Sequence, residues 1–311
     1  MAACLDDSRN QTATICPCSA DFRPVQNNNS LCRLIKFCRP TVFKLSSCNL
    51  VYQKSKSSTK IVPHECDEDY IWLKIQEEAL SSIEQEPILS KYFYSSILSH
   101  CSVESALANQ LAIKLSNSSL PTDTLYEIFF QLLSKDSSIR VAIRDDLKAV
   151  KERDPAWISY VHCFLNFKGF LACQAHRMAH NFWLQGRTVM ALLIQNRVSE
   201  VFAVDIHPGA KIGRGILLDH ATGIVIGETA VIGDNVSILH SVTLGGTGKV
   251  SGDRHPKIGD GVQIGAGTKI LGNIKIGEGA KIGAGSVVLK EVPPKATAVG
   301  NPARIIAVKD R

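Results

Sequence analysis

Side chains that could carry acid–base chemistry gather between residues 205 and 255. Asp205, Asp219 and His220 combine two carboxylates with an imidazole, and Arg254-His255 adds a guanidinium and a second imidazole. Histidine titrates near neutral pH and is the natural general base for a hydroxyl, whereas arginine suits two-point recognition of a carboxylate. From these residues alone, His220 is either such a base or a solvent-facing histidine.

A six-residue repeat positions these side chains. Thirteen aliphatic residues obey it: Ile206, Ile212, Leu218, Ile226, Ile232, Ile238, Leu244, Ile258, Ile264, Ile270, Ile276, Ile282 and Val288. The repeat slips by two residues after Val225 and stops at 245–257, which we interpret as an inserted loop. A helix repeats every 3.6 residues and a strand every two, so neither explains a period of six.

A triangular solenoid explains the repeat. Each hexad forms a short strand and a corner, three hexads complete a coil, and the aliphatic side chains stack inside. Glycine and other small residues allow the tight corners. Asp205 lies 15 residues before His220, which is three short of one coil, so we expect the two near one corner on neighbouring rungs.

Helical spacing replaces the hexads before residue 203. The expected helices are 71–83, 125–133, 136–153 and 187–202. Asp154, followed by Pro155, is expected to cap a further long helix that reaches Trp183. The predicted fold class is therefore α+β, with an N-terminal all-α domain followed by a left-handed parallel β-helix of hexapeptide repeats.

The first 64 residues lack this order. They hold nine Lys and Arg against three Asp, and six of the ten cysteines, whereas the rest of the chain carries 26 basic and 26 acidic residues. A basic, hydroxyl-rich leader is typical of an organellar transit peptide, with a disordered tail as the alternative. A disulfide scaffold would place its cysteines in the folded region, so we expect a reducing compartment.

The composition also argues against binding to nucleic acid or insertion into a membrane, and its changes along the chain indicate four segments. A body without net charge gives no bulk attraction to nucleic acid, and no apolar run approaches the ~18 residues needed to span a membrane. The predicted segments are a leader at 1–64, a helical domain at 65–202, a β-helix at 203–304 and a short tail at 305–311.

Two other chemistries fit the motifs poorly. The glycine-rich run 245–249 is not a G-x-x-x-x-G-K-[ST] phosphate loop and has no strand–loop–helix context, so a nucleotide triphosphatase is excluded. Some hexapeptide solenoids are zinc carbonic anhydrases with three histidines, but the spacing of His207, His220 and His240 closes no such site. We therefore expect no metal cofactor.

Several motifs together resemble those of the serine O-acetyltransferases, hexapeptide-repeat acyltransferases, and most of all the plant-type enzymes. The matching segments are 153–156 (Arg-Asp-Pro-Ala), 205–223, 227–230 (Gly-Glu-Thr-Ala), 244–249 and 252–257 (Gly-Asp-Arg-His-Pro-Lys). The likeness covers about 66–304. It implies transfer of an acetyl group from acetyl-CoA to the hydroxyl of L-serine, giving O-acetyl-L-serine and CoA, the first step of cysteine biosynthesis.

The resemblance also implies the catalytic roles. His220 is the general base, and Asp205 accepts a hydrogen bond from the far nitrogen of its ring and stabilises the imidazolium. Glu228 lies in a matching motif and is expected to contact the residues that bind the substrate.

Serine is a zwitterion, so its partners should carry both signs. Arg254 and His255 are expected to bind the carboxylate, and His255 also to stabilise the developing oxyanion. Asp154 and Asp219 are expected to bind the ammonium group, a role for Asp154 that is compatible with capping a helix.

Small residues near Gly246, Ala266 and Ala284 are expected to line the groove for the pantetheine arm of CoA. Members of this family form active sites between neighbouring subunits and assemble as homotrimers, commonly paired into hexamers. Arg254 and His255 are therefore expected to serve the His220 of an adjacent chain.

The resemblance leaves the lyase partner and the compartment open. Relatives usually carry a flexible tail whose terminal isoleucine enters O-acetylserine (thiol)lyase, whereas this sequence ends seven residues after Arg304, so we expect weak or absent lyase binding. The leader favours a plastid, with the cytosol or mitochondrion as alternatives. Two rival functions are an acetyltransferase for another hydroxyl acceptor and a non-catalytic solenoid scaffold.

Overall fold

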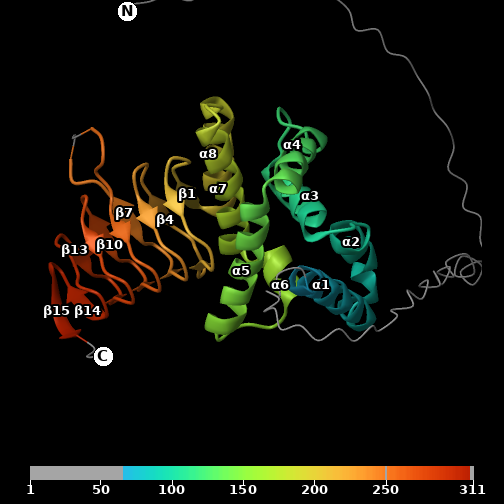
Figure 1. Ribbon diagram of the computed structural model, residues 1–311. Helices are drawn as coiled ribbons and strands as arrows, with labels where there is room; N and C mark the ends of the chain where they lie inside the picture. The colour runs from blue at the N-terminus through green and yellow to red at the C-terminus, as the bar shows by residue number, and fades with distance from the viewer. Residues whose placement is uncertain (1–65, 249–250, 309–311) are drawn as a thin grey trace, which may run out of the picture. The chain divides into compact units, whose positions relative to one another are not determined.

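The computed structural model describes residues 66–248 and 251–308, so the predicted leader lies outside the described residues. Helices come first in this part of the chain and strands follow (Figure 1). The α-helices are α1 (Cys66–Gln85), α2 (Ser90–Phe93), α3 (Val103–Leu115), α4 (Thr122–Lys135), α5 (Ser137–Arg153), α6 (Tyr160–Asn166), α7 (Lys168–Leu184) and α8 (Thr188–Phe202). A 3₁₀ turn (Pro87–Leu89) and a π-helix (Tyr94–Leu98) flank α2. None of the helices in these ranges is long and apolar enough to cross a bilayer.

The strands wind into three sheets that form a parallel β-helix of about five turns, which confirms the predicted fold class. The first sheet contains β1 (Val204–Ile206), β4 (Ile224–Ile226), β7 (Thr243–Gly245), β10 (Lys269–Leu271) and β13 (Val287–Val288). The second contains β2 (Lys211–Ile212), β5 (Val231–Ile232), β8 (Lys257–Ile258) and β11 (Lys275–Ile276). The third contains β3 (Leu217–Leu218), β6 (Ser237–Ile238), β9 (Gln263–Ile264), β12 (Lys281–Ile282), β14 (Ala296–Gly300) and β15 (Ala303–Val308).

The end of the β-helix differs from the other rungs. All strand pairs are parallel except β14 with β15, which pair antiparallel. Residues 305–308 therefore continue a strand, although we expected a short tail from residue 305.

The hexad residues point into the β-helix as predicted. Twelve of the thirteen are buried, and Ile212 is partly buried against the same core. Burying an aliphatic side chain of this size contributes about 1.5–3 kcal/mol. The rungs approach so closely that a Cβ atom on Gly265 would lie 2.5 Å from the backbone nitrogen of Ala284, which explains why glycine occupies that corner.

The prediction of one long helix from Asp154 to Trp183 is wrong. The chain forms a turn there, followed by α6 and α7 as two separate helices. Asp154 ends α5, and its Oδ1 accepts the backbone N–H of Ala156 at 2.8 Å, so the carboxylate stabilises a turn and not a helix start. The N-cap of α6 is Ser159, whose hydroxyl accepts the N–H of His162.

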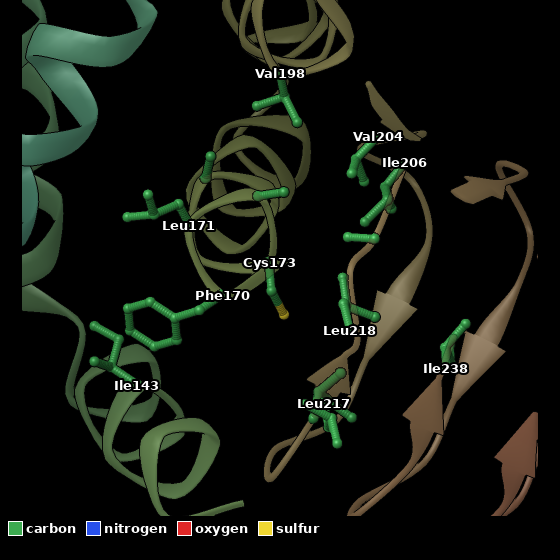
Figure 2. Close-up of a cluster of buried hydrophobic side chains, with 14 of the residues drawn as sticks. Ile143, Phe170, Leu171, Cys173, Val198, Val204, Ile206, Leu217, Leu218 and Ile238 are labelled. Carbon is green, nitrogen blue, oxygen red and sulfur yellow. The ribbon is translucent and has the colours of Figure 1, made fainter. Parts of the chain in front are cut away.

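Helix α7 joins the helical domain to the first coil. Figure 2 shows Cys173 of α7 facing Leu217 and Leu218 of β3. Beside this apolar contact, the buried carboxylate of Asp146 in α5 accepts hydrogen bonds from Arg177 of α7 at 2.7 Å and from the N–H of Ile216 at 2.7 Å. One buried carboxylate thus links two helices to the β-helix.

His176 of α7 predicts how pH changes stability. Burial, followed by the proximity of His180, lowers the pKa of His176 to about 3, so the folded protein holds this ring neutral. The imidazole of His176 binds a proton near pH 6.5 in the unfolded chain but not in the folded chain. Its contribution to stability is therefore fully present above pH 6.5 and is lost as the pH drops. We expect His176 to remove about 2 kcal/mol of unfolding free energy between pH 7 and pH 5.

Urea unfolding of the parent and of His176→Gln at both pH values, at one protein concentration, measures this effect. Other histidines titrate in both proteins, so the difference in pH dependence isolates His176. An equal loss of stability in parent and variant would show that this ring is not held neutral.

Candidate active site

One edge of the β-helix carries the predicted base. We call the turns after β3, β6, β9 and β12 (219–223, 239–242, 265–268 and 283–286) the histidine corner. Here the rings of His220 and His240 lie edge to face, with centroids 6.1 Å apart. Backbone hydrogen bonds from Gly267 to His240 and from Gly285 to the carbonyl of Ala266 stack the following rungs. Ala266 and Ala284 therefore line the same corner as His220.

A cavity of about 580 Å³ opens beside His220. Its lining brings together three of the predicted site residues, Asp154, Asp219 and His220. Asp219 Oδ1 lies 3.9 Å from His220 Nε2, and the His220 side chain is 77% exposed. The cavity thus combines two carboxylates with an imidazole, but a single chain leaves that imidazole open to water.

Arg153 places Asp154 at this cavity. Its guanidinium donates to the carbonyl of Asn235 at 2.6 Å, to the hydroxyl of Ser237 at 2.9 Å and to the carbonyl of Gly215. Since Gly215 and Asn235 belong to successive rungs, the end of α5 is fastened to two coils. The next residue, Asp154, is thereby held at the cavity that Asp219 also lines.

Asp205 does not contact His220 in the described chain. Its Oδ1 accepts a hydrogen bond from Nε2 of Gln195 in α8 at 2.6 Å. The backbones do approach as expected, because Val204 pairs with Ile224 and the chain after His220 runs beside β1. Coil spacing therefore predicts the neighbouring rungs, while the side-chain partner of Asp205 comes from a helix.

A second polar cluster lies at another edge. We call the described residues of the turns after β1, β4, β7 and β10 (207–210, 227–230, 246–248 with 251–256, and 272–274) the arginine corner. Arg254 Nη2 donates to Glu228 Oε2 at 2.8 Å, and this hydrogen bond lowers the pKa of Glu228. Gly246 also lies here, away from Ala266 and Ala284, so the three residues predicted to contact CoA do not share one corner. A Cβ atom on Gly246 would lie 3.6 Å from Arg254.

His255 is held tightly at the arginine corner. Its Nδ1 accepts the backbone N–H of Thr229 at 3.1 Å, so in the neutral ring the proton is on Nε2. Burial, and then the charge of Arg254, lowers the pKa of His255 and favours that neutral form. The ring packs on Gly227, where a Cβ atom would lie 2.0 Å from Nε2. Neutral His255 thus carries a hydrogen-bond donor, as an oxyanion partner requires.

The structure separates the predicted site residues into two groups. Strand β4 begins just after the turn that holds His220 and ends just before Glu228, so a three-residue strand of roughly 10 Å separates the two corners. Arg254 and His255 therefore do not line the cavity beside His220.

The three histidines considered for zinc are likewise divided. His207 lies at the arginine corner, with its ring 5.0 Å from that of Trp183, whereas His220 and His240 share the histidine corner. Within residues 66–248 and 251–308, no group of three or more His, Cys, Asp and Glu side chains could hold a metal ion.

Two residues that the sequence did not predict, Lys168 and Thr229, contact the two corners. Lys168 lines the cavity and donates to the hydroxyl of Thr222, but its place in a helical segment more than fifty residues before His220 carries no signal. Thr229 accepts the N–H groups of Arg254 and His255 through its hydroxyl. The signal for Thr229 was present, because it follows Glu228 in a matching motif.

Two further cavities lie elsewhere, of about 490 and 400 Å³. They flank the hydrogen bond between Asp136 and Asn181, and neither includes a predicted site residue. Of these three cavities, only the one beside His220 is lined by predicted site residues.

Comparisons with known proteins agree with these motifs. A family model described as "Serine acetyltransferase, N-terminal" matches residues 71–175, and one described as "Bacterial transferase hexapeptide (six repeats)" matches 255–290. The chain is 71% identical over 244 residues to "Serine acetyltransferase 1, chloroplastic" of Arabidopsis thaliana, covering 78% of each sequence. It is 59% identical over 311 residues to "Serine acetyltransferase 3, mitochondrial" of that plant, covering 100% of this chain and 79% of the relative.

Solved structures show the same likeness. Soybean serine acetyltransferase complexed with serine aligns with a TM-score of 0.76 at 62% identity, over 79% of this chain and 100% of that one. The serine acetyltransferase from Brucella abortus strain S19 in complex with coenzyme A aligns with a TM-score of 0.77 at 48% identity, over 79% and 99%.

Proposed function

Because the chain belongs to the serine acetyltransferase family, we propose that it transfers the acetyl group of acetyl-CoA to the hydroxyl of L-serine, with His220 as general base. The products are O-acetyl-L-serine, the precursor of cysteine, and CoA. The serine hydroxyl has a pKa far above 7 and needs a base to become a nucleophile, and an imidazole is suited to that step near neutral pH.

The cavity beside His220 is the observation that carries the proposal. Asp154 and Asp219 supply the negative charge that an ammonium group needs, and His220 lies at the same wall. A serine whose ammonium group contacts these carboxylates would present its hydroxyl to the ring. Asp205 orients the ring when its carboxylate turns from Gln195 toward the neighbouring rung.

The arginine corner completes the site from an adjacent chain in a homotrimer, commonly one of two in a hexamer. Arg254 binds the serine carboxylate, neutral His255 donates to the oxyanion, and Glu228 orients Arg254. The pantetheine arm of CoA follows Ala266 and Ala284 of one chain and Gly246 of the next. This arrangement explains why a single chain leaves His220 exposed and keeps its anion-binding residues at a distant edge.

An acceptor panel tests the activity. CoA release from acetyl-CoA, followed with a thiol reagent, is expected to require L-serine and to stay near background with L-homoserine, L-threonine or a sugar. A sugar that exceeds L-serine would favour the rival acetyltransferase, and no turnover with any acceptor would favour a scaffold.

Arg153→Met should weaken serine binding in particular. Without the three contacts of the guanidinium to the coils, Asp154 is no longer held at the cavity. Losing charge-assisted hydrogen bonds of this kind costs roughly 1.5–3 kcal/mol, so we expect the KM for serine to rise by about tenfold or more. Steady-state kinetics measure this, with Arg153→Lys as the conservative variant. A parallel rise of the KM for acetyl-CoA would argue instead for general loosening of the site.

We also propose that the protein acts in a plastid. Its composition in residues 1–64 supports this, as does its likeness to a relative named chloroplastic, although another relative is named mitochondrial. Fusing residues 1–64 to a fluorescent protein tests the assignment. Fluorescence in mitochondria or cytosol would overturn it.

A further inference from the structure

The turn that carries His220 has positive φ angles at two residues that are not glycine. His220 and Ala221 both lie in the left-handed region, with φ of 55° and 58°. Non-glycine residues avoid this region because Cβ crowds the following carbonyl, and two in succession are rarer still. On the next rung, Ser241 has positive φ whereas His240 does not. The surroundings must therefore hold the first turn in place.

Helix α7 supplies one such restraint. Lys168, the first residue of α7, donates from Nζ to the hydroxyl of Thr222. The backbone N–H of Thr222 in turn donates to the carbonyl of His220 at 2.8 Å. One ammonium group thus fastens the far end of the strained turn to a helix.

The start of α7 is itself fixed on the β-helix. A Cβ atom on Gly169 would lie 2.0 Å from the carbonyl oxygen of Leu218, so only glycine permits this approach. Leu218 ends β3 and precedes Asp219 directly. The backbone beside Lys168 therefore packs against β3, the strand that leads into the turn with His220.

We propose that Lys168 is a positioning residue that holds the turn 220–222 through Thr222 and so directs the His220 ring toward the cavity. The proposal rests on the function proposed for His220. The rival role for Lys168 is direct contact with the serine carboxylate, since its side chain also lines the cavity. The two roles differ in whether Thr222 is needed.

Kinetics of three variants distinguish these roles. We expect Lys168→Met and Thr222→Val each to lower kcat about tenfold while the KM for serine stays within about twofold, because a misdirected base slows chemistry more than binding. Both variants remove the hydrogen bond between Lys168 and Thr222, and Thr222→Val also removes the 3.5 Å contact of the hydroxyl with the carbonyl of His220, so the double variant should be no slower than Thr222→Val alone. Lys168→Arg and Thr222→Ser keep donor and acceptor and should retain most of the activity.

A rise in the KM for serine with Lys168→Met, together with parental kcat and KM for Thr222→Val, would overturn the proposal in favour of substrate contact. Additive losses in the double variant would also overturn it. Thr222 is exposed, so its variants report on the turn even if Lys168→Met fails to fold. Failure of the proposed function would look different, because the parent would then not turn over L-serine, or His220→Ala would turn over as fast as the parent.

Discussion

We expect His220→Ala to lower kcat for acetyl transfer to L-serine by at least about 100-fold, the usual scale on which a general base contributes. Removing the imidazole leaves Asp219 and Asp154 at the cavity, but an exposed or half-exposed carboxylate is a much weaker base than a histidine near neutral pH. The KM for serine should change little, because the ammonium partners remain. CoA release at saturating acetyl-CoA and serine measures the effect.

His240→Ala is the matched control for this experiment. His240 occupies the same corner one rung away, and its ring lies 6.1 Å from that of His220, centroid to centroid. It does not line the cavity, so its loss should leave kcat within about threefold of the parent. If His220→Ala turned over as fast as the parent, the proposed mechanism would fail, whatever the state of the fold.

The six-residue spacing predicts which residues form the core, but it does not predict which side chains contact one another. Stacked hexads dictate both an inward direction and a rung, so Ile206 and its equivalents could be assigned to the core from spacing alone. Position on a rung does not determine the partner of a side chain. Asp205 lies on the rung beside His220 as predicted, yet its carboxylate bonds to Gln195, because α8 supplies an amide within reach.

Residues outside the repeat were harder to place for a related reason. The inserted loop 245–257 breaks the period, so spacing could not assign Arg254 to a corner. Lys168 reaches the cavity only because α7 packs onto β3 at Gly169, a tertiary contact that leaves no periodic trace. The motifs nevertheless selected residues that lie in two compact clusters. The sequence therefore predicted the candidate residues, and the structure shows how they group.

The separation of His220 and Arg254 into two corners predicts complementation between two inactive variants. His220→Ala and Arg254→Ala should each be inactive alone and active when mixed in one trimer. Each site would need His220 from one chain and Arg254 from its neighbour, and the two lie at opposite ends of β4 within a chain. In a ring that contains both variants, one of the three sites has both residues, so activity should return to about one third of the parent.

Co-expression with two different tags and purification through both yields the mixed assemblies for this measurement. The matched control mixes Arg254→Ala with His255→Ala. These residues share the arginine corner of one chain, both held by Thr229, so every copy of the corner lacks one of them and no mixture can restore a site. Recovery in the first mixture and not in the second follows only if the two corners meet across a chain boundary. Mixed assemblies that form but stay inactive would instead require both corners to act within one chain, which the separation of the two clusters opposes.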